Sequence, residues 1–174
     1  MPMRQHAELA LPGALIGVVA GAVAGGLTLL AGQPAGLAAT SAVTLALPLG
    51  LLGGGYGILM GRGLFKPGLF APAGLYWLAG FPLSRLLQET VTGLASFGRV
   101  TLSGGLPGFL AYQAMVSLGF AIGFVWLHER LMPPWLMRLR ERNPQARELL
   151  AAYVEHAEAL WLAKERRRAR KGAR

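Results

Sequence analysis

The residues of this chain that could do chemistry are few. Its 174 residues include no cysteine and no aspartate, and the histidines are His6, His128 and His156. Without cysteine, neither a disulfide framework nor a thiolate metal site can form. The HExxH pattern of zinc proteases is absent, as are a phosphate-binding P-loop and a GxSxG nucleophile motif. We therefore predict a protein that is not an enzyme, without catalytic, cofactor-binding or metal-binding residues.

One pair of charged residues, Arg85 and Glu89, has a spacing that could matter. Residues four apart share a helix face, so these two can form an ion pair, with Gln88 between them. Ionisable groups inside a bilayer are costly and usually functional. The pair lies near a helix end if the helix stops at about residue 88, but near mid-helix if it continues to Phe97. Both interpretations stay open, and an enzyme acting on lipids through this pair is a third hypothesis for function.

The elements that position these groups are long uncharged segments. Between Glu8 and Arg62, 53 consecutive residues include no Asp, Glu, Lys or Arg, and only 14% of the whole chain is charged. A soluble domain averages roughly a quarter charged residues. A helix needs about 20 apolar residues to cross a bilayer, so this run predicts two membrane spans. Glycine and proline in residues 31–36 mark the turn between them.

The same reasoning predicts an all-α, polytopic membrane protein with a bundle of four transmembrane helices. The predicted spans cover about 10–31, 37–60, 69–88 and 108–128, between an N-terminal segment 1–9 and a basic tail 129–174. The first apolar segment is too long for a cleaved signal peptide. Basic residues favour the cytoplasmic side of short loops, and 12 of the 17 follow the last span. We therefore expect a multi-pass protein of the bacterial inner membrane with both termini in the cytoplasm.

Glycine spacing is the most regular pattern within the predicted spans. Small residues at every fourth position let helix backbones approach closely in lipid. We predict that such glycines pack helices together within the chain, against a partner subunit or second copy, or around a pore. The glycines concerned are Gly13, Gly17, Gly21, Gly25, Gly53, Gly57, Gly61, Gly119 and Gly123.

Two prolines lie inside predicted spans. Pro48 and Pro82 should kink or locally open their helices. Pro48 is followed by Gly50 and Gly54, which makes the middle of the second span the weakest predicted helix. Broken helices form substrate or ion sites in many transporters, whereas a packing kink is the simpler interpretation.

The tail differs in composition from the rest of the chain. Residues 129–174 hold 12 basic and six acidic residues, and we expect the fourth span to end near Pro133. Asn143 and Pro144 form a helix start, with Asn as the cap and Pro in the first turn. An amphipathic helix is predicted over about 144–167. Its apolar positions, Leu150, Tyr153, Leu160 and Trp161, are predicted to dock a partner.

A basic run ends this helix. Its members are Lys164, Arg166, Arg167, Arg168, Arg170 and Lys171. Such a run binds anionic lipid or RNA, and nucleic acid is the less favoured of these. Acidic residues that precede the run argue against a helix lying wholly on the membrane. We therefore expect a protein partner for residues 144–163 and lipid for residues 164–174.

Taken together, these patterns predict a non-enzymatic accessory or assembly subunit of a bacterial inner-membrane complex. Its expected partners are membrane lipids and either other membrane subunits or a second copy of the chain. No cofactor is expected. The alternative is a small transporter or channel that uses the second span, broken at its proline and glycines.

Overall fold

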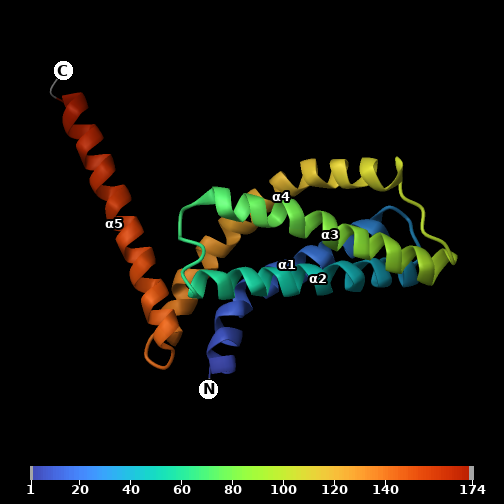
Figure 1. The fold of residues 1–174 in the computed structure, drawn as a ribbon, viewed down its shortest axis with the longest axis horizontal. Coiled ribbons are helices and arrows are strands. Elements are labelled where there is room, and N and C mark those ends of the chain that lie inside the picture. Colours follow the sequence, from blue (N-terminus) through green and yellow to red (C-terminus); the bar gives the residue numbers. More distant parts are fainter. Residues whose placement is uncertain (1, 173–174) are drawn as a thin grey trace.

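The computed structural model describes residues 2–172, which form five α-helices and no strand. The helices are α1 (Pro2–Leu30), α2 (Ala35–Gly61), α3 (Phe70–Phe97), α4 (Gly105–Leu139) and α5 (Pro144–Gly172). The first four run lengthwise in one bundle, and α5 leaves one end of it at a steep angle (Figure 1). We call this end, with the 62–69 and 140–143 loops, the α5 end. The all-α class predicted from the sequence is confirmed.

Three of the helices in residues 2–172 are long and apolar enough to cross a membrane: α1, α2 and α4. They indicate a multi-pass membrane protein, since apolar helices of this length span a bilayer core of about 30 Å. Helix α3 is not among the three. It is 28 residues long, but Arg85, Gln88 and Glu89 lie in its interior.

The structure gives helix ends that the sequence left open for α3 and placed earlier for α4. α3 continues past Glu89 to Phe97, and α4 continues through Pro133 and Pro134 to Leu139. The helix that holds the fourth predicted span therefore does not end at this proline pair. A proline removes one backbone hydrogen bond, and buried residues on both sides of the pair, Met132 and Leu136 among them, hold this turn in place. Residues 2–9 are also helical, as part of α1.

In the described part of the chain, neither α2 nor α3 is interrupted at its internal proline, Pro48 or Pro82. α2 is helical through Pro48, Gly50 and Gly54, and α3 is helical through Pro82. Gly50 and Gly54 are buried, and they pack against α1. Contact with the neighbouring helix thus compensates for the weak helix propensity of this segment.

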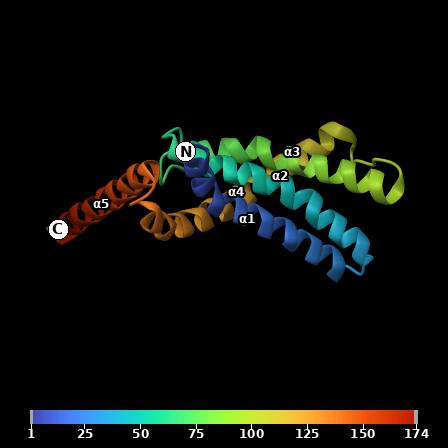
Figure 2. The same cartoon turned by 90° about the horizontal axis from the view of Figure 1, so that it is seen from below.

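Helices α1 and α2 approach each other backbone to backbone (Figure 2). A methyl group added at Gly13 would overlap the carbonyl oxygen of Gly53, and one added at Gly53 would overlap that of Gly13. The same crowding recurs along the pair. Gly17 meets Leu49 and Gly50, Gly21 meets Ala46, Gly25 meets Ala42, and Gly57 and Gly61 meet Leu9. At Gly13, Gly17, Gly21, Gly53 and Gly57 the nearest atoms include backbone of the other helix, so only glycine fits there without a shift of the helices, whereas Gly61 meets only the Leu9 side chain.

The predicted glycines of α4 lie differently. A methyl group at Gly119 or Gly123 would meet nothing within 4 Å among the described residues. Ser117 and Ala121, on another side of the same helix, are buried in the bundle. The structure therefore does not bring the α4 glycines together with those of α1 and α2.

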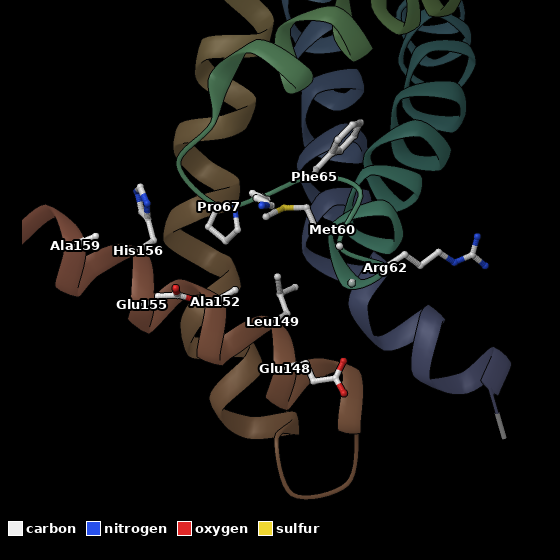
Figure 3. A pocket seen from close by; sticks show the side chains of 13 residues that line it. Met60, Arg62, Phe65, Pro67, Glu148, Leu149, Ala152, Glu155, His156 and Ala159 are labelled. Carbon is white, nitrogen blue, oxygen red and sulfur yellow. The ribbon is translucent and has the colours of Figure 1, made fainter.

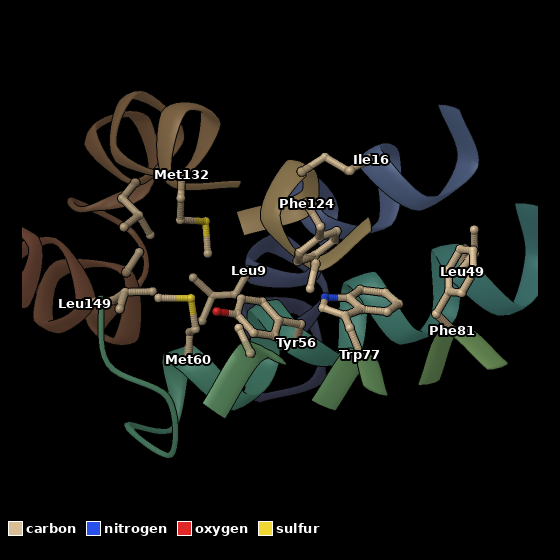
Figure 4. Close-up of a cluster of buried hydrophobic side chains, with 14 of the residues drawn as sticks. Leu9, Ile16, Leu49, Tyr56, Met60, Trp77, Phe81, Phe124, Met132 and Leu149 are labelled. Atoms are coloured by element: carbon tan, nitrogen blue, oxygen red, sulfur yellow. The ribbon is translucent and has the colours of Figure 1, made fainter. Parts of the chain in front are cut away.

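Aromatic side chains fill the space between the α1–α2 pair and the other two helices (Figure 4). The Trp77 ring of α3 lies 4.6 Å from the Phe124 ring of α4 and 4.7 Å from that of Phe120. Tyr56 of α2 meets Phe124 edge-on at 5.2 Å. Tyr76 of α3 donates a hydrogen bond of 2.7 Å to the Leu52 carbonyl. These contacts join α2, α3 and α4 in the half of the bundle nearer α5.

The glycine contacts lead to a test of stability. Gly13→Ala forces α1 and α2 apart, and overpacking of this kind costs about 1–3 kcal/mol of unfolding free energy. Gly119→Ala is the matched control, because its new methyl meets open space. Alanine favours a helix over glycine by up to about 1 kcal/mol, so the control is expected to be neutral or stabilising. Thermal unfolding in detergent measures both, and equal melting temperatures would contradict the interpretation.

Candidate functional site

The α5 end of the bundle is organised around the side chain of Asn143. This residue is 0% exposed. Its oxygen accepts a 3.2 Å hydrogen bond from the Ala146 N–H, which caps α5 as the sequence predicts. Its amide nitrogen donates at 3.1 Å to both the Gln5 carbonyl and a Glu8 carboxylate oxygen. One side chain therefore joins the start of α5 to the first turns of α1.

Glu8 extends this network to α4. The Trp135 indole N–H donates at 2.7 Å to the Glu8 carbonyl. The Glu8 carboxylate lies 3.3 Å from the Arg142 guanidinium and 3.7 Å from that of Arg4. Beneath these polar contacts lies a small apolar core formed by Met132, Leu136, Leu139, Ala146 and Leu149. The direction in which α5 leaves the bundle is thus determined by packing and by hydrogen bonds.

The first half of α5 packs along the 62–69 loop (Figure 3). Leu149 is buried, and the His156 ring lies so close to Gly68 that no side chain fits there. Gly68 also has a positive φ of 77°, which favours glycine. Its N–H donates at 2.8 Å to Glu129 of α4. The loop is therefore held between α4 and α5.

Between this loop and α5 lies an open cleft of about 530 Å³. Arg62 and Lys66 line it from the loop, and Glu148 and Glu155 line it from α5. Arg62 points away from α5 (Figure 3). Among the salt bridges of residues 2–172, none joins these loop cations to the α5 carboxylates. The cleft is therefore a mixed-charge surface without a focused site.

Tyr153 places a phenol at the buried side of α5. Its hydroxyl has no hydrogen-bond partner within residues 2–172. Burial raises the pKa of Tyr153 well above its ordinary value of 10.0, and the nearby Glu129 carboxylate and Tyr56 phenol raise it further. The neutral phenol therefore suits the packed state, and its ionisation opposes that state.

The four residues predicted to dock a partner do not form one surface. Leu150 and Tyr153 are partly buried and pack against the core of the same chain. Leu160 is 59% exposed and Trp161 is 58% exposed. The predicted basic residues are all exposed along the distal half of α5. They are Lys164, Arg166, Arg167, Arg168, Arg170 and Lys171.

Arg85 and Glu89 belong to a polar network between α2 and α3. Their side chains are 2.7 Å apart, and Arg85 also donates to Gln88. Gln88 is buried and donates at 2.6 Å to the Ser41 hydroxyl and at 3.2 Å to its carbonyl oxygen. Since α3 runs from Phe70 to Phe97, the network lies midway along that helix. The mid-helix interpretation of Arg85 is therefore the correct one.

Sequence reasoning missed the tertiary roles of two polar residues. Glu8 and Asn143 are 135 positions apart, and no local pattern indicates their contact. It also missed that His128 is 0% exposed, with neither ring nitrogen hydrogen-bonded within the described residues. The His128 ring stacks on Phe124 at 5.5 Å and meets Tyr56 edge-on at 5.0 Å. His128 follows Phe124 by four residues, and this spacing is the sequence signal from which a shared helix face could have been inferred.

Comparison with protein-family models, curated proteins and solved structures finds no match for this chain. The functional interpretation therefore depends on the geometry of the bundle and of α5. Two features of that geometry stand out. One is α5, whose start is fixed to the bundle by hydrogen bonds, and the other is the polar network halfway along α3.

The buried phenol predicts how the α5 packing responds to pH. The pKa of Tyr153 is higher in the folded state than in the unfolded state. The phenol is therefore neutral in both states at neutral pH, and the free energy of unfolding falls only as the pH rises above 10.0, where the unfolded state ionises first. The loss is at most about 1.4 kcal/mol per pH unit. Tyr153→Phe is expected to remove this component and to cost little at neutral pH, since the hydroxyl has no partner.

Melting temperatures of the wild type and of this variant across pH 8 to 11 provide the measurement. Tyr112→Phe is the control for loss of a hydroxyl, because Tyr112 is exposed on α4. The same alkaline loss in the wild type and in Tyr153→Phe would show that the phenol is not responsible.

Proposed function

We propose that this chain is a non-enzymatic accessory or assembly subunit of a bacterial inner-membrane complex. In this proposal four helices span the membrane, both termini are cytoplasmic, and α5 docks a partner subunit. The observation that carries it is a largely exposed apolar flank on a helix whose start is fixed by hydrogen bonds and packing. A pre-organised helix of this kind loses little conformational entropy when it binds.

The flank consists of Leu150, Val154, Ala157 and Trp161. These residues are spaced by four, three and four positions, so they lie on one side of the helix. Val154 is 51% exposed, and Trp161 is more exposed still. The side of α5 that packs on the bundle, marked by Leu149 and buried Ala146, is a different one. Packing within the chain therefore leaves Val154, Ala157 and Trp161 of the flank free, whereas Leu150 at its start is partly buried against the core.

The occupant that fits the flank best is an amphipathic helix of a partner subunit. A shallow depression of about 750 Å³ borders Leu150 and Val154. Arg140 and Arg147 line it, as do Glu155 and Glu158. A helix with an apolar stripe and charges of both signs complements such a surface, in the way that amphipathic helices occupy grooves.

Photo-crosslinking in native membranes tests this docking. A photoreactive phenylalanine at Ala157 is expected to give one discrete adduct, identified by mass spectrometry as another membrane protein. The same group at Ala159 is the matched control, because Ala159 is also exposed but faces the cleft side of α5. Trp161→Glu is expected to reduce the adduct about tenfold or more, since buried tryptophans are frequent hot spots.

The folding of each variant is checked by its melting temperature, which should equal that of the wild type. Equal adducts from positions 157 and 159 would contradict a directed flank. An adduct that Trp161→Glu leaves unchanged would contradict docking through this side of α5.

A second candidate is a small transporter or channel, and the network of Arg85, Gln88 and Glu89 favours it. Polar and charged residues midway along a bundle helix usually line a path or a site. Because α2 is an unbroken helix, the path would follow this network and Ser41 rather than an unwound segment near Pro48. The network also has the simpler role of holding α2 against α3.

Reconstituted vesicles separate these roles. If the chain conducts, proton or chloride flux is expected in the wild type and is reduced at least about tenfold in Glu89→Gln, because an ionisable group on the path is lost. Arg99→Gln is the control, since Arg99 lies in the loop after α3. No flux in the wild type, with a lower melting temperature in Glu89→Gln, would leave the network a purely structural role.

A further inference from the structure

The side of α5 that packs on the bundle continues past the edge of the bundle. Leu149, Tyr153 and His156 mark this side in the first half of the helix, through their contacts with the core and with Gly68. Steps of three and four residues carry the same side onward to Leu160 and beyond. Figure 1 shows that α5 crosses the end of the bundle and extends well beyond it. The distal half therefore presents this side to whatever surrounds the bundle.

Charge is divided between the two sides of this distal half. At 100° per residue, the bundle-facing side carries basic residues and no acidic residue. Its members are Leu160, Ala163, Lys164, Arg167, Arg170 and Lys171. The acidic residues of this half, Glu158 and Glu165, lie on the outward side. The acidic residues therefore do not oppose an anionic surface beneath the helix.

Residues of the kind found at a membrane–water boundary lie on α4 beside the start of α5. On α4, Trp126 is 58% exposed, and the Arg130 guanidinium lies 5.0 Å from the centre of its ring. Tryptophan and arginine together are typical of the boundary layer of membrane proteins. Glu129, one residue away, binds the Gly68 N–H beneath the His156 ring of α5. α5 thus leaves the bundle beside the part of α4 that carries Trp126 and Arg130.

We infer that the distal half of α5 lies on the anionic lipid surface beside the bundle, with Lys164, Arg167, Arg170 and Lys171 directed at lipid phosphates. Their long aliphatic stems let the charged ends reach the headgroups, while Leu160 contacts the upper part of the acyl region. The proposed binding surface is a bilayer that contains anionic phospholipid. The flank proposed for a partner subunit is another side of the helix, so either proposal can fail without the other.

Site-specific labelling of the full chain tests this arrangement. The chain has no native cysteine, so Ala163→Cys and Ala169→Cys each take a single nitroxide label. Residue 163 is on the bundle-facing side and residue 169 on the outward side. The protein is reconstituted in vesicles of phosphatidylcholine alone or mixed with phosphatidylglycerol. The accessibility of each label to an aqueous nickel chelate is then measured.

The label at residue 163 is expected to become severalfold less accessible in phosphatidylglycerol vesicles only, and the label at residue 169 to stay accessible. One-molar salt is expected to restore access to the label at residue 163, because the Debye length falls to about 3 Å and the charge attraction is screened. Arg167→Glu changes the charge by two units and should weaken the protection about 25-fold, at about fivefold for each unit. Arg166→Glu, the same charge change on a neighbouring lateral position about 100° around the helix from Arg167, should weaken the protection less.

Three results would overturn the inference. They are equal accessibility of the two labels, equal protection in neutral and anionic vesicles, and an Arg166→Glu effect as large as that of Arg167→Glu. Protection of residue 163 that needs added RNA, with no response to phosphatidylglycerol, would assign the basic side to nucleic acid instead. Unchanged melting temperatures of the variants show that any loss of protection is not unfolding.

Discussion

The close approach of α1 and α2 is the constraint on which the rest of the structure depends. In lipid, apolar side chains gain little by leaving their surroundings, so helices associate through close packing and dispersion. Gly13 and Gly53 remove every side-chain atom between the two backbones, and an added methyl at either would overlap a carbonyl of the other helix. The hairpin then presents Tyr56 to the aromatic rings of α3 and α4, including Trp77 and Phe124.

The same contact determines where α5 leaves the bundle. Near the α5 end, Gly57 and Gly61 of α2 accommodate Leu9 of α1. Glu8, the preceding residue, then meets Asn143, which caps α5. A shift of α1 along α2 would therefore displace the carboxylate that orients the cap. Packing deep in the bundle and the direction of the C-terminal helix are mechanically connected.

Residue types predicted the classes of element, but not how neighbouring helices carry a helix through a proline. The uncharged run from Leu9 to Gly61 indicates two apolar helices, because helix length follows bilayer thickness, and Asn143 indicates a helix start by local capping chemistry. The continuity of α2 through Pro48 and of α4 through Pro133 depends on neighbouring helices, which no local pattern contains. The same is true of the contact between Glu8 and Asn143, since it is set by tertiary packing.

The amphipathic pattern of α5 shows why tertiary information changes a functional interpretation. Read as an isolated helix, Leu150, Tyr153, Leu160 and Trp161 form one broad apolar face, and the nearby glutamates weaken the case for membrane contact. Packing of Tyr153 within the chain divides that face into two sides. Leu160 then shares a side with basic residues, and Trp161 lies on the free flank. A helix whose start is fixed by Asn143 holds both sides in register with the bundle, so lipid and protein contacts can be made at the same time.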